Sequence, residues 1–412
     1  MFIPRVYLMA TLCAATPVFA GPVPFDAPNQ ISPYTQVQTS NVRFNRWISG
    51  FRTRALNAGI SPANFDRAFG NISYNDSVID LDRNQSEFSK ALWDYLDTAV
   101  SDARIRNGRA AKERMESTLR EIEATYGVDA NIVAAIWGLE SAYGAVRGST
   151  DTIDALATLA CEGRRGAFFE GELLAVLTIL QNEAYSPDYL VGSWAGAMGH
   201  TQFMPTSYLE YAVDGNGDDW RDIWGDDPTD ALASTANYLR EFGWVTGQPW
   251  GVEVLLPATF DYTLANRDNT LLPSGWAADG VTDLNGQPVE DYGVASILLP
   301  AGHQGPAFMI FKNFEVLEAY NTADAYVIGV GHLADRIAGG DAVQAAWPRR
   351  DGALSGADRR ELQQRLRDVG FDPQAIDGRI GPLTINAIRA YQIANNLVPD
   401  GYASPQLLNR LR

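Results

Sequence analysis

The sequence predicts a mainly α-helical (α+β) protein with a small inserted β subdomain and a separate three-helix module at its C-terminal end. Three observations lead to this prediction. Apolar residues recur at helical spacing from Phe44 onward, strand-like runs gather between 251 and 312, and a turn motif repeats near the C-terminus. At about 150 residues per domain, 412 residues supply two to three folded units.

The composition is that of an ordinary globular protein, with 46% hydrophobic and 20% charged residues. Fifty acidic residues against 32 basic residues leave a net charge of −18. A general nucleic-acid binder needs a basic face, and so does a polybasic peripheral membrane protein. We therefore expect neither nucleic acid nor a membrane surface as the partner.

Residues 1–20 are typical of a secretory signal peptide, with an early Arg5, a short apolar run and small residues around Val18-Phe19-Ala20. No later run is long and apolar enough for a membrane span, so we expect an exported, periplasmic protein. Leu12 stands before Cys13, where a lipidation site needs a small residue, so we expect no lipid anchor. Cys161 then remains alone, and no internal disulfide is expected.

Residues 21–40 are rich in Pro, Asn, Gln, Ser and Thr, which predicts a disordered tether before a main domain at 41–345. Within that domain, Met115, Leu119, Ile122 and Tyr126 lie on one face of a helix predicted over 109–126. A glycine at 127 ends this helix. An Asp at 129 can cap the next one, whose almost continuous apolar run over 132–140 indicates deep burial.

The rest of the chain shows the same kinds of pattern. Further helices are predicted at about 166–183, 229–242 and 314–338, and the β insertion at about 250–312 has strand-like runs at 252–256 and 295–299. A linker is expected at 346–353 and the last module at 354–412.

The last module contains an internal half-repeat. Asp377-Gly378 precedes Pro382, and 23 residues later Asp400-Gly401 precedes Pro405. A predicted core of three helices is formed by apolar residues at helical spacing, namely Leu362, Leu366, Ile388 and Tyr391. Ten arginines against seven acidic residues in 348–412 make this module positive, unlike the rest of the chain.

Glu140 is the first candidate for a catalytic residue. It follows Val133, Ile136 and Trp137 by seven, four and three residues, so it shares their apolar helix face. Loss of hydration raises the pKa of such a carboxyl towards neutrality, which a general acid needs. A structural Glu that pairs with an Arg or caps a neighbouring helix has the same spacing, and this alternative stays open.

The stretch 195–205 combines small residues with one amide side chain, Gln202. Small residues let a ligand approach the backbone, and an amide both donates and accepts hydrogen bonds, which suits a sugar cleft. A glycine-rich segment that packs between helices is the alternative.

Residues 214–218 place oxygen ligands at positions 1, 3 and 5 of a loop, from Asp214, Asn216 and Asp218, and the Trp220 carbonyl can serve at position 7, as in an EF-hand. Position 12 holds a glycine where that motif has a Glu, and Asp219 replaces the glycine at position 6. A plain Asx-turn loop is the alternative.

Five separated motifs give the sequence a resemblance to a known family. Residues 137–144 (WGLESAYG), 154–159 (DALATL), Arg164-Arg165, 196–205 and Tyr320-Asn321 resemble the lytic murein transglycosylase B family in order and spacing across about 45–338. Residues 362–408 resemble the three-helix peptidoglycan-binding domain, with its Asp-Gly-x-x-Gly-Pro-x-Thr turn at 377–384. Ser404 departs from the glycine usual in the second turn.

The resemblance implies a lysozyme-like helical catalytic domain that acts on peptidoglycan glycan strands. It implies cleavage of the β-1,4 bond between N-acetylmuramic acid and N-acetylglucosamine, with closure of a 1,6-anhydro ring in place of hydrolysis. Glu140 would act first as the acid and then as the base. Glycosidases ordinarily use two carboxylates, whereas here the acetamido group of the substrate could take the place of the second.

The resemblance also implies the substrate-binding residues and an ion. The positions that match its cleft are Ser193, Gln202, Tyr238, Tyr320, Asn321 and Tyr326, and its basic pair matches Arg164 and Arg165. It places a structural calcium or sodium ion in the 214–220 loop, with Asp230 as the last acidic ligand, and it implies no cofactor for catalysis.

Two other functions remain open at this point. A hydrolytic muramidase would use the same Glu140 to activate water. A non-catalytic peptidoglycan-binding scaffold would keep only the targeting role of the C-terminal module. Neither a His-Glu-x-x-His nor a Gly-x-Ser-x-Gly motif occurs, which counts against a wall peptidase or amidase.

Overall fold

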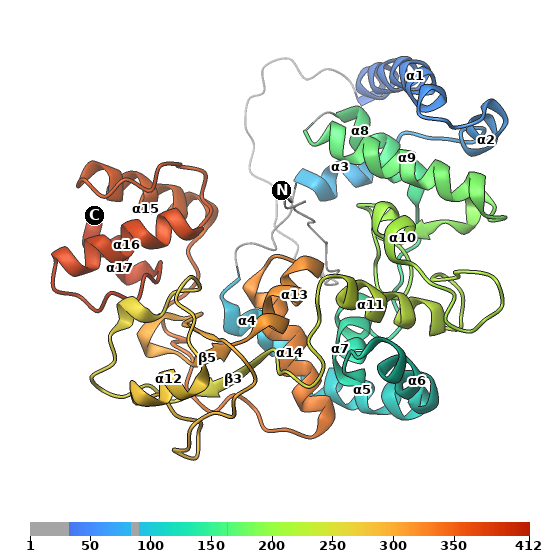
Figure 1. Cartoon of the computed structure of the whole chain (residues 1–412). Helices are drawn as coiled ribbons and strands as arrows, with labels where there is room; N and C mark the ends of the chain where they lie inside the picture. The colour runs from blue at the N-terminus through green and yellow to red at the C-terminus, as the bar shows by residue number, and fades with distance from the viewer. Residues whose placement is uncertain (1–32, 84–89, 163) are drawn as a thin grey trace. The chain divides into compact units, whose positions relative to one another are not determined.

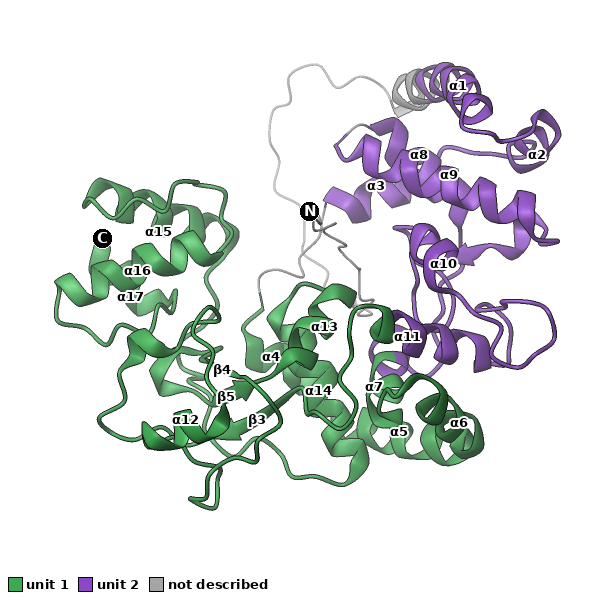
Figure 2. Cartoon of the chain, in the orientation of Figure 1, with its two compact units in different colours: residues 1–8, 86–136, 239–412 green, residues 9–85, 137–238 purple. Residues whose placement is uncertain are grey.

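The computed structural model describes residues 33–83, 90–162 and 164–412, which form two compact units (Figure 2). Among the described residues, unit 1 contains 90–136 and 239–412, and unit 2 contains 33–83, 137–162 and 164–238. Two helices, α7 (Ala130–Ser141) and α11 (Thr229–Glu241), contribute to both units. The predicted signal peptide lies outside the described residues. In the described part of the chain, no helix has the length and apolar character that crossing a membrane requires.

Unit 2 is built around two adjacent helices, α8 (Thr152–Glu162) and α9 (Gly166–Asn182) (Figure 1). Their facing sides are apolar and buried, as for Leu156 and Val176. α1 (Pro33–Asn57) and α3 (Asp76–Arg83) pack on α8, whereas α2 (Pro62–Ala68) and α10 (Pro205–Tyr211) pack on α9. The two short strands β1 (Thr150–Asp151) and β2 (Val191–Gly192) pair antiparallel.

The tether predicted over 21–40 needs a correction at its C-terminal end. α1 begins at Pro33, so its first two turns cover residues expected to be disordered. Once a helix has nucleated, each added residue gains a hydrogen bond at little further cost, and Pro is favoured in the first turn. A polar composition therefore did not prevent helix extension here. The remainder of that segment, 21–32, lies outside the described residues.

The helical part of unit 1 is centred on α14 (Asp324–Ala338), which packs against α4 (Leu92–Ala99), α5 (Asp102–Arg114) and α13 (Lys312–Tyr320). The single helix predicted over 109–126 is wrong, because α5 ends before Met115 and α6 (Glu116–Tyr126) begins after it. The predicted helix at 314–338 is likewise divided into α13 and α14. In both cases the apolar spacing continues across the break, so periodicity alone did not reveal it.

The predicted β insertion is present in unit 1 as an antiparallel sheet of order β3-β5-β4, formed by β3 (Gly251–Val254), β4 (Ser296–Leu298) and β5 (Ala307–Ile310). Gly251 pairs with Ile310, and Ser296 pairs with the same residue on the other edge. The short helix α12 (Pro273–Ala278) supplies Trp276, which is fully buried and donates a hydrogen bond to the Ala295 carbonyl at 2.8 Å.

The C-terminal module has the three predicted helices, α15 (Gly356–Asp368), α16 (Pro382–Ala394) and α17 (Pro405–Leu411). The four predicted core residues are all buried. The structure adds two buried glutamines to the half-repeat. Gln363 holds the first turn through Asp377 and Gly378, and Gln392 holds the second through Asp400 and Gly401, in each case with one donated and one accepted hydrogen bond of 2.7–3.1 Å.

The segment predicted as a linker at 346–353 is anchored within unit 1. Trp347 packs on Trp93, with ring centroids 6.5 Å apart, and Arg349 forms a two-pronged ion pair with Asp97 at 2.7 and 2.8 Å. Such contacts limit how freely this segment can move within the unit.

Candidate active site

Glu140 is the last but one residue of α7, in the part of the helix that belongs to unit 2. The predicted N-terminal cap is present, because the Asp129 carboxylate accepts a hydrogen bond from the Asn131 amide at 2.6 Å. The helix is buried as predicted, and only 4% of Glu140 is exposed. The sequence therefore places a carboxyl group inside an apolar environment.

The chain reverses sharply after Glu140. Ala142 and Tyr143 both have positive φ, at 50° and 61°, and the Tyr143 ring returns over α7. Gly138 makes this close approach possible, since a Cβ at that position would lie 2.5 Å from the Tyr143 ring. Left-handed conformations in bulky residues are costly and concentrate at functional sites.

The stretch 195–205 forms a tight bridged turn, in which Gly196 also packs closely on Leu156 of α8. Met198 pairs with Gly192 on one side and Phe203 on the other. Ser193 accepts a hydrogen bond from the Ala197 amide at 3.0 Å. Gln202 has φ of 55°, is 2% exposed, and donates hydrogen bonds to the carbonyls of Arg147 and Gly199 at 3.0 and 2.8 Å. Its side chain is thus fixed by the backbone around it.

His200 joins this turn to α7, and the sequence analysis did not identify it. Trp137 Nε1 donates to His200 Nδ1 at 3.1 Å, which leaves the proton on Nε2 to be donated to the Gly225 carbonyl at 2.7 Å. The His200 carbonyl accepts from the Ser141 hydroxyl at 2.5 Å. Burial lowers the pKa of His200, so the ring is neutral near pH 7. A lone buried histidine without a motif gives no sequence signal of this role.

The remaining predicted cleft residues fall into two groups. Tyr238 of α11 belongs to unit 2 with Glu140 and packs edge-on against Tyr211, with centroids 4.8 Å apart. Tyr320 and Tyr326 belong to unit 1, where their rings are parallel at 6.5 Å, and Asn321 between them accepts a hydrogen bond from the Ala323 amide at 3.1 Å. Each group is internally ordered.

Arg164 and Arg165 converge on the carboxylate of Asp82 in α3. The Arg164 guanidinium reaches both the Asp82 side chain at 2.5 Å and the Asp82 carbonyl at 2.8 Å, and Arg165 reaches the carboxylate at 3.0 Å. The carboxylate side chain is 9% exposed, whereas the two Arg side chains are 56% and 30% exposed. A buried acid therefore holds a basic pair that keeps part of its surface in solvent.

The predicted cation loop brings three carboxylates together. Oxygen atoms of Asp214, Asp218 and Asp230 all lie within 4.8 Å of one another. Burial raises the pKa of Asp230, whereas backbone amides of the loop outweigh burial and lower the pKa of Asp214. Asp230 also closes the loop, because it accepts hydrogen bonds from the amides of Gly215 and Asp222 at 2.9 and 2.7 Å. Trp220 is 45% exposed, and its amide is held by Asp218.

Comparison with known families shows the family to which the chain belongs. Residues 43–335 match the family model of the transglycosylase SLT domain, which is well over half of the chain. The chain belongs to the transglycosylase SLT domain family. Residues 355–411 of this family member match a second model, the peptidoglycan binding domain.

Individual relatives agree with this assignment. A curated relative from Escherichia coli (strain K12), membrane-bound lytic murein transglycosylase B, is 35% identical over 255 residues, which are 59% of this chain and 66% of the relative. The crystal structure of SltB3 from Pseudomonas aeruginosa in complex with NAG-NAM-pentapeptide is 48% identical, with a TM-score of 0.87 over 90% of this chain and 99% of that one. Escherichia coli Slt35 in complex with calcium is 32% identical, with a TM-score of 0.61 over 72% of this chain and 92% of that one.

The comparisons confirm the predicted family, the mainly α fold and the C-terminal peptidoglycan-binding module. They confirm a lytic transglycosylase at the level of the family. The individual site residues, the domain boundaries and the ion stay predictions.

Proposed function

We propose that this family member is a lytic transglycosylase that cleaves the β-1,4 bond between N-acetylmuramic acid and N-acetylglucosamine and leaves 1,6-anhydromuramic acid ends. The observation that carries this proposal is the buried Glu140 at the end of α7, in a chain of this family. The relatives with peptidoglycan fragments or a murein transglycosylase in their names support the substrate class.

Glu140 performs both proton transfers. Burial disfavours the ionised form, so the carboxyl group can deliver a proton to the glycosidic oxygen. The resulting carboxylate then takes the proton from the muramoyl 6-hydroxyl as that oxygen attacks C1. The attacking group belongs to the substrate, so no second carboxylate is required to activate water, in contrast with ordinary glycosidases.

The predicted cleft residues bind the glycan. Gln202 is fixed at both amide hydrogens by backbone carbonyls, so its carbonyl oxygen can accept a hydrogen bond from a sugar. The other proposed sugar contacts are made by the polar atoms of buried residues that are 1–7% exposed, namely Ser193, Tyr238, Tyr320, Asn321 and Tyr326. His200 does not touch substrate in this scheme and acts as a positioning residue for the turn that carries Gln202.

The basic pair contributes through its exposed side. Asp82 occupies one face of Arg164 and Arg165 and fixes their orientation. A guanidinium has five donors, so each Arg retains hydrogens for a lactyl or peptide carboxylate of the substrate.

We propose that the loop at 214–230 holds a structural calcium or sodium ion, with no cofactor in catalysis. Hard cations prefer several oxygen ligands, and the converging carboxylates of Asp214, Asp218 and Asp230 fit that preference. The side-chain oxygen of Asn216 and the Trp220 carbonyl would complete the set. The calcium complex of a relative supports the choice of ion.

The C-terminal module retains the enzyme on peptidoglycan, and residues 1–20 direct export to the periplasm, where that substrate lies. The module carries a net positive charge, which favours binding to a carboxylate-rich polymer.

Mass spectrometry of the products from purified peptidoglycan tests the reaction. We expect muropeptides with anhydromuramic ends from the parent protein, and none from Glu140→Gln, which keeps the shape of the side chain but cannot transfer the proton. Glu121→Gln, at an exposed position of α6, is the matched control and should retain full turnover. Reducing muramic acid ends would instead establish a hydrolytic muramidase, and a folded protein that releases no product would support the scaffold.

A further inference from the structure

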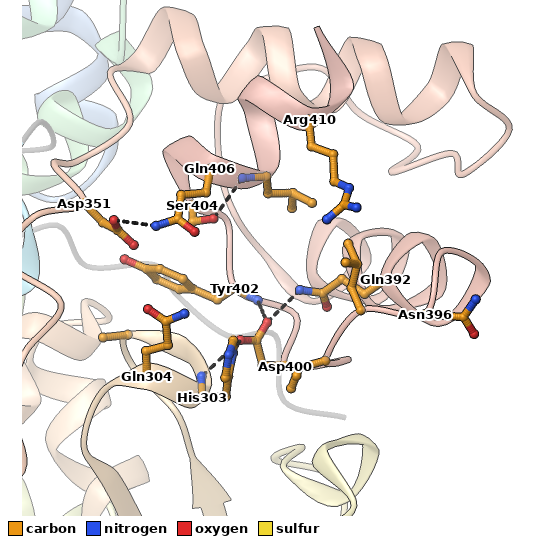
Figure 3. Close-up of a pocket in the computed structure, with 14 residues that line it drawn as sticks. His303, Gln304, Asp351, Gln392, Asn396, Asp400, Tyr402, Ser404, Gln406 and Arg410 are labelled. Carbon is orange, nitrogen blue, oxygen red and sulfur yellow. Dashed lines mark hydrogen bonds and ion pairs between the residues drawn. The ribbon is translucent and has the colours of Figure 1, made fainter.

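A pocket lies where the C-terminal module meets the β subdomain, and both belong to unit 1 (Figure 3). Its volume is about 350 Å³, within the range of small-ligand sites. Ala301, His303 and Gln304 from the loop before β5 line one side, and residues of 351–410 line the others. We call it the shared pocket, because neither domain forms it alone.

The second turn of the half-repeat fixes the module to the β subdomain at this pocket. One oxygen of Asp400 accepts from Gln392, and the other contacts the His303 amide at 3.0 Å and the His303 ring at 2.5 Å. Gly302 allows this approach, since it has φ of 68° and a Cβ there would lie 2.7 Å from Asp400. Arg389 adds a hydrogen bond to the Ala265 carbonyl at 2.7 Å.

The first turn of the half-repeat has no such role. Asp377 forms the equivalent bond to Gln363 but is exposed, and within the described residues it contacts nothing in the β subdomain. The two turns thus share their internal hydrogen bonds and differ in what lies against them. Of the two turns, the second alone contacts the β subdomain among the described residues, and the shared pocket lies beside that contact.

The shared pocket presents polar groups whose hydrogen-bonding capacity is unused. Within the described residues, Arg410 forms neither an ion pair nor a side-chain hydrogen bond, and the Tyr402 hydroxyl forms no hydrogen bond. Asp351 uses one carboxylate oxygen, to accept from Gln406 at 2.8 Å, and keeps the other. Figure 3 shows Asp351 and Arg410 on different sides of the pocket residues, with the Tyr402 ring pointing toward Asp351.

Burial and the nearby charges of Asp351 and Asp400 raise the pKa of Tyr402 to about 12. The hydroxyl is therefore protonated at physiological pH and can donate a hydrogen bond. The pocket thus offers a cation at Arg410 on one side, and a carboxylate oxygen of Asp351 with the Tyr402 hydroxyl on the other side.

We propose that the shared pocket binds a peptide stem of peptidoglycan through a carboxylate at Arg410 and an ammonium group at Asp351. The proposal rests on the proposed function, which makes peptidoglycan the substrate. The hydroxyl and acetamido groups of the glycan are neutral and would form an ion pair with neither Arg410 nor Asp351. A stem peptide with a diamino acid carries both a carboxylate for Arg410 and an ammonium group for Asp351. Charge-assisted hydrogen bonds at two separated points would also fix the direction of the peptide.

Isothermal titration calorimetry of the whole mature protein tests this site. The probe is a stem tripeptide that ends in diaminopimelate, and the comparison ligand is the same peptide with its carboxylates amidated. We expect the unmodified peptide to bind, the amidated peptide to bind at least tenfold more weakly, and Arg410→Glu and Asp351→Asn each to weaken binding at least tenfold. Arg379→Glu reverses an exposed charge on the first turn and should bind as the parent does.

Methyl NMR of the parent protein locates the bound peptide. Signals of Val398 and Leu397, which line the pocket, should shift on saturation. Unchanged affinity in both pocket variants, or shifts confined to unit 2, would overturn the proposal. So would pocket shifts caused by a peptide-free disaccharide and not by the tripeptide. Product analysis on the same samples separates the two hypotheses, because loss of peptide binding with intact release of anhydro ends leaves the proposed function standing.

Discussion

Replacement of His200 by phenylalanine should destabilise unit 2 by roughly 3 kcal/mol. The change keeps an aromatic ring but removes two buried hydrogen bonds, one from Trp137 at 3.1 Å and one to Gly225 at 2.7 Å. The hydrogen bond to Gly225 is worth about 1 kcal/mol net, and the buried Trp137 N–H left without its acceptor costs about 1–3 kcal/mol. The Gly225 carbonyl is not left without a donor, because it also accepts a hydrogen bond from Arg147.

Thermal unfolding followed by near-ultraviolet circular dichroism measures this change. At about 2–4 °C per kcal/mol, the melting temperature should fall by roughly 6–12 °C at pH 7.5. A double-mutant cycle with Trp137→Phe isolates the hydrogen bond, since removal of both partners leaves no buried donor without an acceptor. The double variant should therefore be more stable than the sum of the single effects indicates. A fall of less than about 2 °C, or purely additive effects, would refute the argument that His200 holds the turn to α7.

Four further predictions follow from other parts of the structure. Asp82→Asn should lower stability by about 1–2 kcal/mol, because two Arg partners lose a charged acceptor but remain partly solvated, and denaturant titration measures this. Calcium at about ten times its dissociation constant should stabilise the chelator-treated protein by about 1.4 kcal/mol, and Asp230→Asn should abolish both this gain and the calorimetric heat. Burial lowers the pKa of His332 to about 4, so between about pH 6.5 and 4 the unfolded chain binds a proton that the folded chain does not, and stability is lost as the pH falls. In His332→Gln, the melting temperature should therefore fall less than in the parent protein over the same pH range. Deletion of 350–412 should reduce sedimentation with insoluble peptidoglycan while soluble glycan is still cleaved, and equal sedimentation of both forms would contradict the targeting role.

Much of the architecture follows from local patterns. The buried run that ends in Glu140 is a helix because its apolar residues are continuous and an Asp caps its start. The core of the C-terminal module follows from helical spacing. The break at Met115 was missed because the apolar stripe continues through it, and helix spacing records which face is buried but not whether the backbone hydrogen bonds are unbroken.

The candidate site could be predicted only in part, for a different reason. Glu140 and Gln202 stand out in the sequence as polar residues in apolar or glycine-rich surroundings. Two contacts that orient the site join distant residues: His200 of the turn lies 63 residues from Trp137 of α7, and Asp82 lies 82 residues from Arg164. No spacing rule connects residues so distant, and such pairs become visible only in the folded chain.

The two glutamine-held turns of the C-terminal module have a consequence for the order of folding. Gln363 reaches a turn 15 residues ahead, and Gln392 reaches one 9 residues ahead, so both links close short loops. Short loops cost little entropy to close, and proteins rich in local contacts fold rapidly. The sheet of the β subdomain instead pairs β3 with β5, as for Gly251 and Ile310, which are 59 residues apart. The C-terminal module is therefore expected to complete its structure before the surface on which it docks.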